Sequence, residues 1–129
     1  MMGNNTKLEF IGIKESREGF LTYEYTVRSK DGTTVGAACL RLGNVPDALG
    51  NIGYETDEPY RGRGHATDAC RRLLTEAASL GQACLFICCD EKNTASRRVC
   101  EKLGAKLYGE ICRPDGGRVQ RYRIIKEDI

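Results

Sequence analysis

The sequence is poor in several features on which whole classes of protein depend. It has no apolar run close to the roughly 20 residues that a membrane-spanning helix needs. Its 20 basic and 18 acidic residues leave a formal charge of only +2, so no strong field attracts nucleic acid or an anionic membrane. Residues 1–7 are polar and lack the apolar core of a secretory signal peptide. We therefore expect no nucleic-acid partner and no membrane.

The chain also lacks the residue spacing of a zinc site. It has a single histidine, and Cys84, Cys88 and Cys89 form no Cys-x-x-Cys pair. We therefore expect no metal and interpret these three cysteines as small strand residues. The seven cysteines are odd in number, and most fall within regular apolar patterns. Free thiols in a reducing, cytoplasmic compartment are therefore expected, rather than a disulfide framework.

Length and residue patterns favour an α+β fold. A chain of 129 residues, 40% of them hydrophobic, can form a single domain over residues 1–129 that buries roughly two-thirds of its unfolded surface. Apolar alternation and turn residues predict seven strands, at 7–14, 20–28, 33–42, 50–56, 83–89, 106–112 and 118–125. Helical spacing predicts two main helices, over 64–80 and from Asn93 or Thr94 to about 103, ended by Gly81 and Gly104.

The most informative segment is Tyr60-Arg61-Gly62-Arg63-Gly64-His65-Ala66-Thr67, between a predicted strand and a predicted helix. Two glycines one residue apart let the backbone approach a ligand and direct successive N–H groups into one concavity. The first turn of the helix adds unpaired N–H groups and the positive end of the helix dipole. These features together predict a site for a phosphate or pyrophosphate group.

Two common phosphate loops do not fit this segment. A P-loop requires Gly-Lys-Ser/Thr, where this chain has Gly64-His65-Ala66. A dinucleotide fingerprint requires a third glycine, where Thr67 stands. The pattern Arg/Gln-x-x-Gly-x-Gly/Ala is met from Arg61 to Ala66. It resembles the acyl-CoA pyrophosphate loop of the GNAT superfamily of N-acetyltransferases; the alternative is a plain glycine-rich turn.

A second segment strengthens this resemblance. Residues 90–105, Asp-Glu-Lys-Asn-Thr-Ala-Ser-Arg-Arg-Val-Cys-Glu-Lys-Leu-Gly-Ala, are similar to the superfamily's Asn-x-x-Ser/Ala…Glu-Lys-x-Gly-Phe region. The distance between the two motifs leaves room for one helix and one strand. The resemblance covers roughly residues 33 to 125.

The resemblance implies the acyl-CoA N-acyltransferase fold, a mixed and mostly antiparallel twisted sheet of about seven strands with two main helices. Members usually carry two further helices after the first strand, which wall part of the acceptor site. Residues 15–19 are too short to hold them. Either the acceptor cleft is unusually open or a second subunit covers it, in which case the protein is a functional homodimer.

The resemblance also assigns an acetyl-CoA site. The pantetheine arm would insert between the strands at 50–56 and 83–89, with its thioester ending near Asn93 and Ser96. Backbone N–H groups of residues 61–66 would hold the pyrophosphate, whatever the side chain of His65, and Arg97 or Arg98 could meet the 3′-phosphate or be surface charge. The expected cofactor-binding residues are Thr56, Arg61, Gly62, Arg63, Gly64, His65, Ala66, Thr67, Asn93 and Ser96.

Direct attack by an amine on the thioester needs a base and an acid. Glu55 lies just before the pyrophosphate loop and is the candidate base, ordered water or an ordinary strand role being the alternatives. Many members carry an acid tyrosine seven residues after the helix-opening asparagine, where this chain has Cys100. Ser96 is the preferred catalytic hydroxyl, and Tyr108 and Tyr122 are alternatives.

These features predict an N-acetyltransferase that moves an acetyl group from acetyl-CoA to a primary amine in a ternary complex. The acceptor could be a small molecule or a peptide, since no charge pattern in the sequence specifies one. A non-catalytic acetyl-CoA-binding or regulatory module is the alternative, because the acceptor wall and the acid tyrosine are both missing. A thiol-sensing domain based on the cysteines is a third, weaker alternative.

Overall fold

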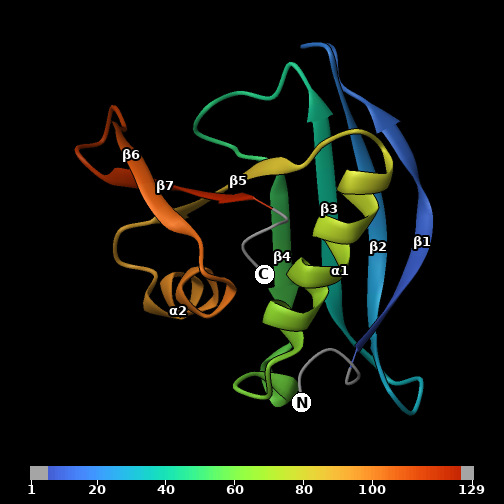
Figure 1. Ribbon diagram of the computed structural model, residues 1–129. Coiled ribbons are helices and arrows are strands. Elements are labelled where there is room, and N and C mark those ends of the chain that lie inside the picture. Colours follow the sequence, from blue (N-terminus) through green and yellow to red (C-terminus); the bar gives the residue numbers. More distant parts are fainter. Residues whose placement is uncertain (1–5, 126–129) are drawn as a thin grey trace.

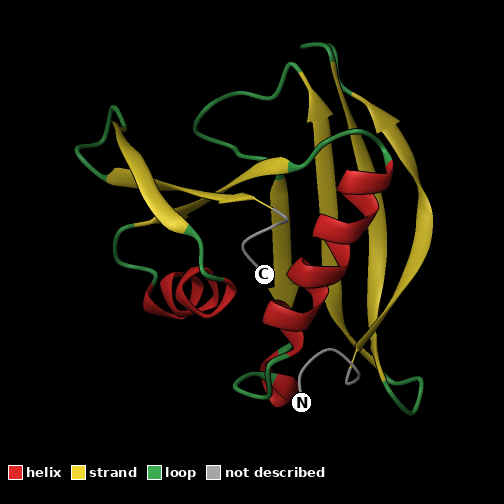
Figure 2. Cartoon of the chain, viewed as in Figure 1, coloured by secondary structure: helices red, strands yellow, loops and turns green. Residues whose placement is uncertain are grey.

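The computed structural model describes residues 6–125, which form seven strands, two α-helices and one short 3₁₀ helix (Figures 1 and 2). The elements are, in chain order, β1 Thr6–Glu15, β2 Phe20–Ser29, β3 Thr34–Gly43, β4 Ile52–Thr56, η1 Glu58–Tyr60, α1 His65–Ser79, β5 Cys84–Asp90, α2 Thr94–Leu103, β6 Lys106–Cys112 and β7 Arg118–Ile125. The α+β class, the seven strands and the two main helices that the sequence predicts are confirmed.

The strands form two antiparallel sheets rather than one continuous sheet. The first has the order β1-β2-β3-β4 and the second the order β5-β7-β6. The division falls between β4 and β5, the two strands that were expected to splay apart. The connection from β1 to β2 is a turn, closed by the bond from Ser16 N–H to the Phe20 carbonyl at 2.9 Å, so no helix lies there.

The two helices pack against different strands: α1 against the four-stranded sheet, and α2 against α1 and β5. In Figure 1, α1 crosses one face of the four-stranded sheet, while α2 lies beside the β5–β7 sheet. The inner face of α1 is fully buried at Cys70, Leu73 and Ala77, as the helical spacing predicts. Leu80 belongs to the same pattern but is 49% exposed, because the helix ends at Ser79.

Within the described residues, Asn51 joins the two sheets by hydrogen bonds. Its backbone N–H donates to the Phe86 carbonyl at 2.8 Å, and its side-chain oxygen accepts from Phe86 N–H at 2.8 Å. The Asn51 side-chain nitrogen donates to the Arg41 carbonyl of β3 at 3.0 Å. Next to it, Gly50 forms an isolated antiparallel bridge with Ile87. Beyond this junction, within the described residues, β4 pairs only with β3 and β5 only with β7.

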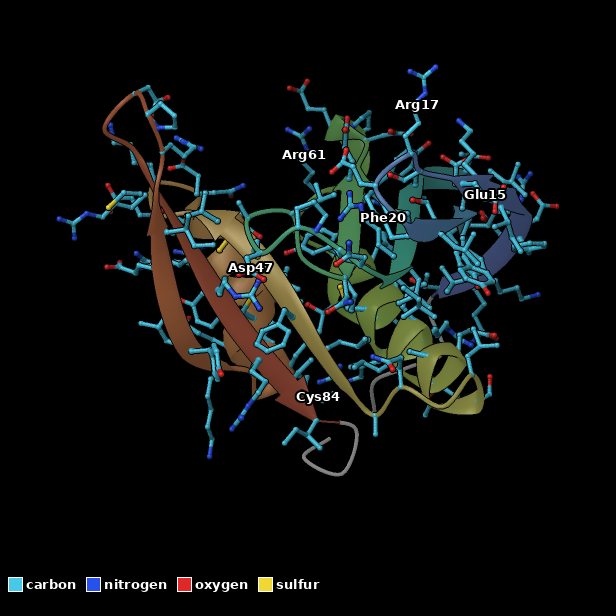
Figure 3. All side chains as sticks on the ribbon, turned by 90° about the horizontal axis from the view of Figure 1, so that it is seen from above. Glu15, Arg17, Phe20, Asp47, Arg61 and Cys84 are labelled. Atoms are coloured by element: carbon cyan, nitrogen blue, oxygen red, sulfur yellow. The ribbon has the colours of Figure 1, made fainter. Side chains whose placement is uncertain are left out.

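The loop before β4 is held against the second sheet. The Asp47 carbonyl accepts hydrogen bonds from the Arg121 guanidinium and from the Cys88 thiol, the latter at 3.2 Å. Figure 3 shows Asp47 beside β5 and β7, well apart from Glu15 and Arg17 at the β1–β2 end. This contact holds the loop against the middle of β5 and β7, two residues beyond Phe86, the partner of Asn51.

Replacing Asn51 with alanine should destabilise the protein by about 1–3 kcal/mol, because the Phe86 N–H and the Arg41 carbonyl both lose a partner at a half-buried site. Urea unfolding measures this loss. Asn44→Ala is the matched control, since the Asn44 side chain makes one exposed hydrogen bond, to the Glu18 carbonyl at 3.1 Å, and its loss should cost about 0.5 kcal/mol or less. Equal losses in the two variants would contradict the role given to Asn51.

Candidate functional site

A cleft of about 900 Å³ opens where β4 and β5 diverge. One wall is β4, from Ile52 to Thr56, and another is the start of α2. The segment from Arg61 to Thr67 lies at the cleft as well, apart from Arg63. The two motifs found in the sequence, far apart along the chain, therefore meet at one cavity.

The glycine-rich loop has the backbone that its sequence predicts. Gly62 and Gly64 both adopt the left-handed conformation, with φ of 78° and 85°. Gly64 is the N-cap of α1, and the Asp68 N–H donates to its carbonyl at 3.0 Å. The N–H groups of residues 65–67 belong to the first helical turn and have no intrahelical acceptor. They form, with the helix dipole, a site suited to an anion.

The two arginines of the loop lie differently from each other. Arg61 Nε donates to the Thr56 carbonyl at 2.9 Å, so its side chain ties the loop to the end of β4 (Figure 3). The Arg63 guanidinium lies over the Tyr60 ring, 5.9 Å from its centroid, and its side chain does not line the cleft. Of the two arginines, only Arg61 therefore lines the cleft.

The His65 imidazole is an anchor for the loop. It is 8% exposed, and its Nδ1 lies 3.0 Å from Oγ1 of Thr6, a fully buried residue of β1. The hydrogen bond joins the first residue of α1 to the edge strand, 59 positions away. The sequence expectation that the imidazole is not needed for phosphate contact agrees with this position, but nothing local in the sequence indicates the partner.

Asn93 and Ser96 open α2 at the cleft. The Asn93 side-chain oxygen accepts from Ser96 N–H at 3.0 Å, which makes Asn93 the N-cap, one of the two caps that the sequence predicts. Ser96 is 9% exposed and lines the cleft together with Asn93. Both residues therefore lie at the cleft, at the start of α2.

The Ser96 hydroxyl has a partner that sequence reasoning missed. Tyr54 Oη lies 2.6 Å from Ser96 Oγ, across the cleft between β4 and α2. Burial raises the pKa of the Tyr54 hydroxyl above its ordinary value, so the phenol stays protonated. The available signal was strand alternation, which places Tyr54 on the face of β4 opposite to Glu55.

Glu55 lies on the exposed face of β4 and lines the cleft. Its carboxylate forms no hydrogen bond or ion pair with residues 6–125, and it is therefore free to accept a proton from a bound molecule. The neighbouring residue on the same face, Gly53, is closely packed, since an added Cβ would lie 2.8 Å from an Arg41 nitrogen and 2.9 Å from the Cys39 sulfur.

Three cysteines lie beneath the Tyr54–Ser96 pair. Hydrogen bonds from the Cys100 thiol and then from the Ser96 hydroxyl lower the pKa of the Cys89 thiol. The hydrogen bond to Cys89 and burial both raise the pKa of the Cys100 thiol, and burial raises that of Cys70. All seven cysteines are free thiols. Cys100 is fully buried and lies outside the cleft lining.

The other tyrosines considered for catalysis lie elsewhere. Tyr108 is 60% exposed on β6, with its ring against Phe86 at a centroid distance of 5.1 Å. The Tyr122 hydroxyl donates to Gln120 within β7, and neither tyrosine lines the cleft. Among the basic residues of α2, Arg98 and Lys102 line the cleft. Arg97 instead donates to the Glu91 carbonyl at 3.4 Å.

Residues 6–125 hold neither a metal-binding cluster nor a membrane-spanning helix. No group of three or more histidine, cysteine, aspartate or glutamate side chains is placed to hold a metal ion. Neither described helix is long and apolar enough to cross a membrane.

Comparison with known structures gives close agreement in fold. The chain is similar to a GNAT-family acetyltransferase from Bacillus anthracis, with a TM-score of 0.67 and 23% identity over 81% of this chain and 66% of that one. It is similar to an acetyltransferase from Salmonella typhimurium that modifies the N-terminal serine of the 50S ribosomal subunit protein L7/L12, with a TM-score of 0.68 and 23% identity over 81% and 63% of the two chains. A ribosomal L7/L12 α-N-protein acetyltransferase in complex with coenzyme A gives a TM-score of 0.69 and 22% identity over 84% and 64%.

The chain thus spans less than two-thirds of the length of each of these structures. The comparison with curated proteins gave no match. Residues 5–106 match the family model of the acetyltransferase (GNAT) domain, which covers most of the chain. On this match, and with the fold in agreement, the chain belongs to the GNAT acetyltransferase family.

Proposed function

We propose that the chain is an acetyl-CoA-dependent N-acetyltransferase, which moves the acetyl group to a primary amine by direct attack in a ternary complex. One observation carries the proposal: the first turn of α1, with its unpaired N–H groups, and the open edges of β4 and β5 lie at the same cleft. We further propose that residues 1–129 act as one domain in the cytoplasm, where the free thiols would stay reduced.

The residues present fit acetyl-CoA along its length. The pyrophosphate would bind the backbone N–H groups near Gly62 and Gly64, where the glycines leave open space. The amides of the pantetheine arm would pair with the free strand edges, whose backbone groups otherwise lack ladder partners. Arg98 and Lys102 add positive charge at the cleft for the remaining phosphate.

The chemistry would need one base and one hydroxyl near the sulfur. We assign the base to Glu55, because its carboxylate is exposed at the cleft and makes no competing bond within residues 6–125. We assign Ser96 as the hydroxyl that donates a hydrogen bond to the leaving sulfur, because it lies on the cleft wall opposite β4. Ordered water remains the alternative base.

The acceptor would be an amine that enters from an open side. The β1–β2 connection is a short turn, and Arg17 in it points away from the rest of the molecule (Figure 3). The similar Salmonella enzyme acts on the N-terminal serine of a protein. A peptide with a free N-terminal serine is therefore the first candidate, followed by a polyamine and an aminoglycoside. Incubation of each with acetyl-CoA and mass spectrometry of the products tests the proposal. Binding of acetyl-CoA without any acetylated product would instead favour a regulatory binding module.

Replacing Gly64 with alanine should weaken CoA binding, because the new methyl group occupies the open space where the pyrophosphate would approach. Calorimetry with CoA measures the affinity. Gly116→Ala is the matched control: Gly116 also has a positive φ, of 89°, and open space around its Cβ position, but lies in the β6–β7 turn. Both changes should cost about 1–2 kcal/mol of stability from left-handed backbone strain, and only Gly64→Ala should lose affinity. Unchanged CoA binding by Gly64→Ala would refute this assignment.

Replacing Glu55 with glutamine should lower the turnover rate by about 10²–10⁴-fold, the range that general-base catalysis contributes, with CoA affinity retained. The acid limb of the pH–rate profile should also flatten, because a titrating carboxylate has been removed. Glu58→Gln, which changes an exposed carboxylate three residues further along, should leave the rate unchanged. A profile for Glu55→Gln with the height and shape of the wild type would transfer the role of base to water.

A further inference from the structure

Tyr54 and Ser96 form a short hydrogen bond across the cleft. Tyr54 is the middle residue of β4, and Ser96 lies in the first turn of α2, 42 positions later. Their hydroxyl oxygens are 2.6 Å apart, at the short end of the range for O–H···O bonds. Both side chains line the cleft, so the bond faces the space into which a ligand would enter.

Either hydroxyl of this pair could donate, and the neighbouring groups favour the phenol as the donor. A hydrogen bond from the Ser96 hydroxyl is one of the causes that lower the pKa of the Cys89 thiol. A serine hydroxyl has one proton, so the bond between Tyr54 and Ser96 must then use the phenol proton. The Tyr54 hydroxyl keeps that proton, because burial raises its pKa. Without a ligand, the order of donation is therefore Tyr54 to Ser96, and Ser96 to the Cys89 sulfur.

We propose that Tyr54 is a positioning residue for acetyl transfer, which holds the Ser96 oxygen in place so that, once a thioester is bound, the Ser96 proton turns from Cys89 to the sulfur that leaves. The inference rests on the proposed function and adds a residue to it. Ser96 is fixed twice: Asn93 accepts its backbone N–H at 3.0 Å, and Tyr54 donates to its side-chain oxygen. A donor that itself accepts a hydrogen bond is polarised and becomes the stronger donor.

The step balances without any further reactant. The amine nitrogen forms a bond to the carbonyl carbon, the C–S bond breaks, and its electron pair stays on sulfur. Ser96 donates a hydrogen bond to the thiolate as it leaves. The proton that the amine gives up on attack balances the proton that turns the thiolate into CoA thiol. Tyr54 keeps its own proton throughout.

The kinetic test is a double-mutant cycle on Tyr54→Phe and Ser96→Ala. With acetyl-CoA and the peptide that carries a free N-terminal serine, Tyr54→Phe should lower kcat by about tenfold, the effect of losing one hydrogen bond. The Kd for CoA should stay the same. In the Ser96→Ala background the same change should have almost no further effect, because there is no hydroxyl left to orient. Tyr25→Phe, which removes the hydroxyl of a buried tyrosine in β2 outside the cleft, is the control and should keep the wild-type kcat.

An unchanged kcat in Tyr54→Phe would overturn the proposal. An equal loss in the wild-type and Ser96→Ala backgrounds would overturn it too, because a purely structural role predicts additive effects.

A second measurement separates this inference from the proposed function. The rate at which iodoacetamide alkylates Cys89, followed by peptide mass spectrometry across pH, reports the pKa of that thiol without any acetyl transfer. Tyr54→Phe should shift the midpoint to higher pH, because a freely rotating Ser96 hydroxyl stabilises the thiolate less, and Tyr25→Phe should not shift it. If the wild type acetylates none of the amines but this shift is seen, the proposed function fails while the positioning of Ser96 stands. An unshifted midpoint would overturn the positioning.

Discussion

The cleft depends on the hydrogen bonds of one residue, Asn51. Its backbone and side chain together take the place of one step of a sheet ladder, and they join β4 to β5 while also holding β3. Because Asn51 supplies a side-chain acceptor where a continuous sheet would supply a backbone carbonyl, the two strands can be fastened at one end and still diverge. Both strand edges remain without ladder partners beyond it, within the described residues. The same bonds that connect the two sheets thus leave the slot between them open.

Local sequence signals predicted the elements well. Alternation gave the strands, and the glycines at 81 and 104 end both helices in the left-handed conformation that was expected of them. The loop from Arg61 to Thr67 could be found because its requirements are local: two glycines, one following helix and a preceding strand. The same holds for the Asn93 cap, since its acceptor and donor are three residues apart. In each case the physical cause lies within a few residues of the pattern.

The contacts that complete the site were beyond local reasoning. The His65–Thr6 bond spans 59 positions and the Tyr54–Ser96 bond spans 42, and no pattern in either segment names its partner. Sequence reasoning sought a tyrosine hydroxyl seven residues after Asn93 and found Cys100 there. The fold brings a tyrosine hydroxyl to the Ser96 side chain from β4 instead. The separation into two sheets also depends on Asn51, which reads in the sequence as an ordinary polar residue at the start of a strand.

The bond between His65 and Thr6 joins the first turn of α1, the proposed phosphate site, to the outermost strand of the first sheet. An edge strand has a neighbour on one side only, and its end is among the first parts of a sheet to detach. Here that detachment would release the imidazole at the first residue of α1. Attachment of β1 would therefore strengthen the binding of a ligand at this turn. The bound ligand would in turn stabilise the attached strand, since the two equilibria are thermodynamically linked. The ordering of the chain's first strand becomes part of the affinity for a molecule that the strand itself does not touch.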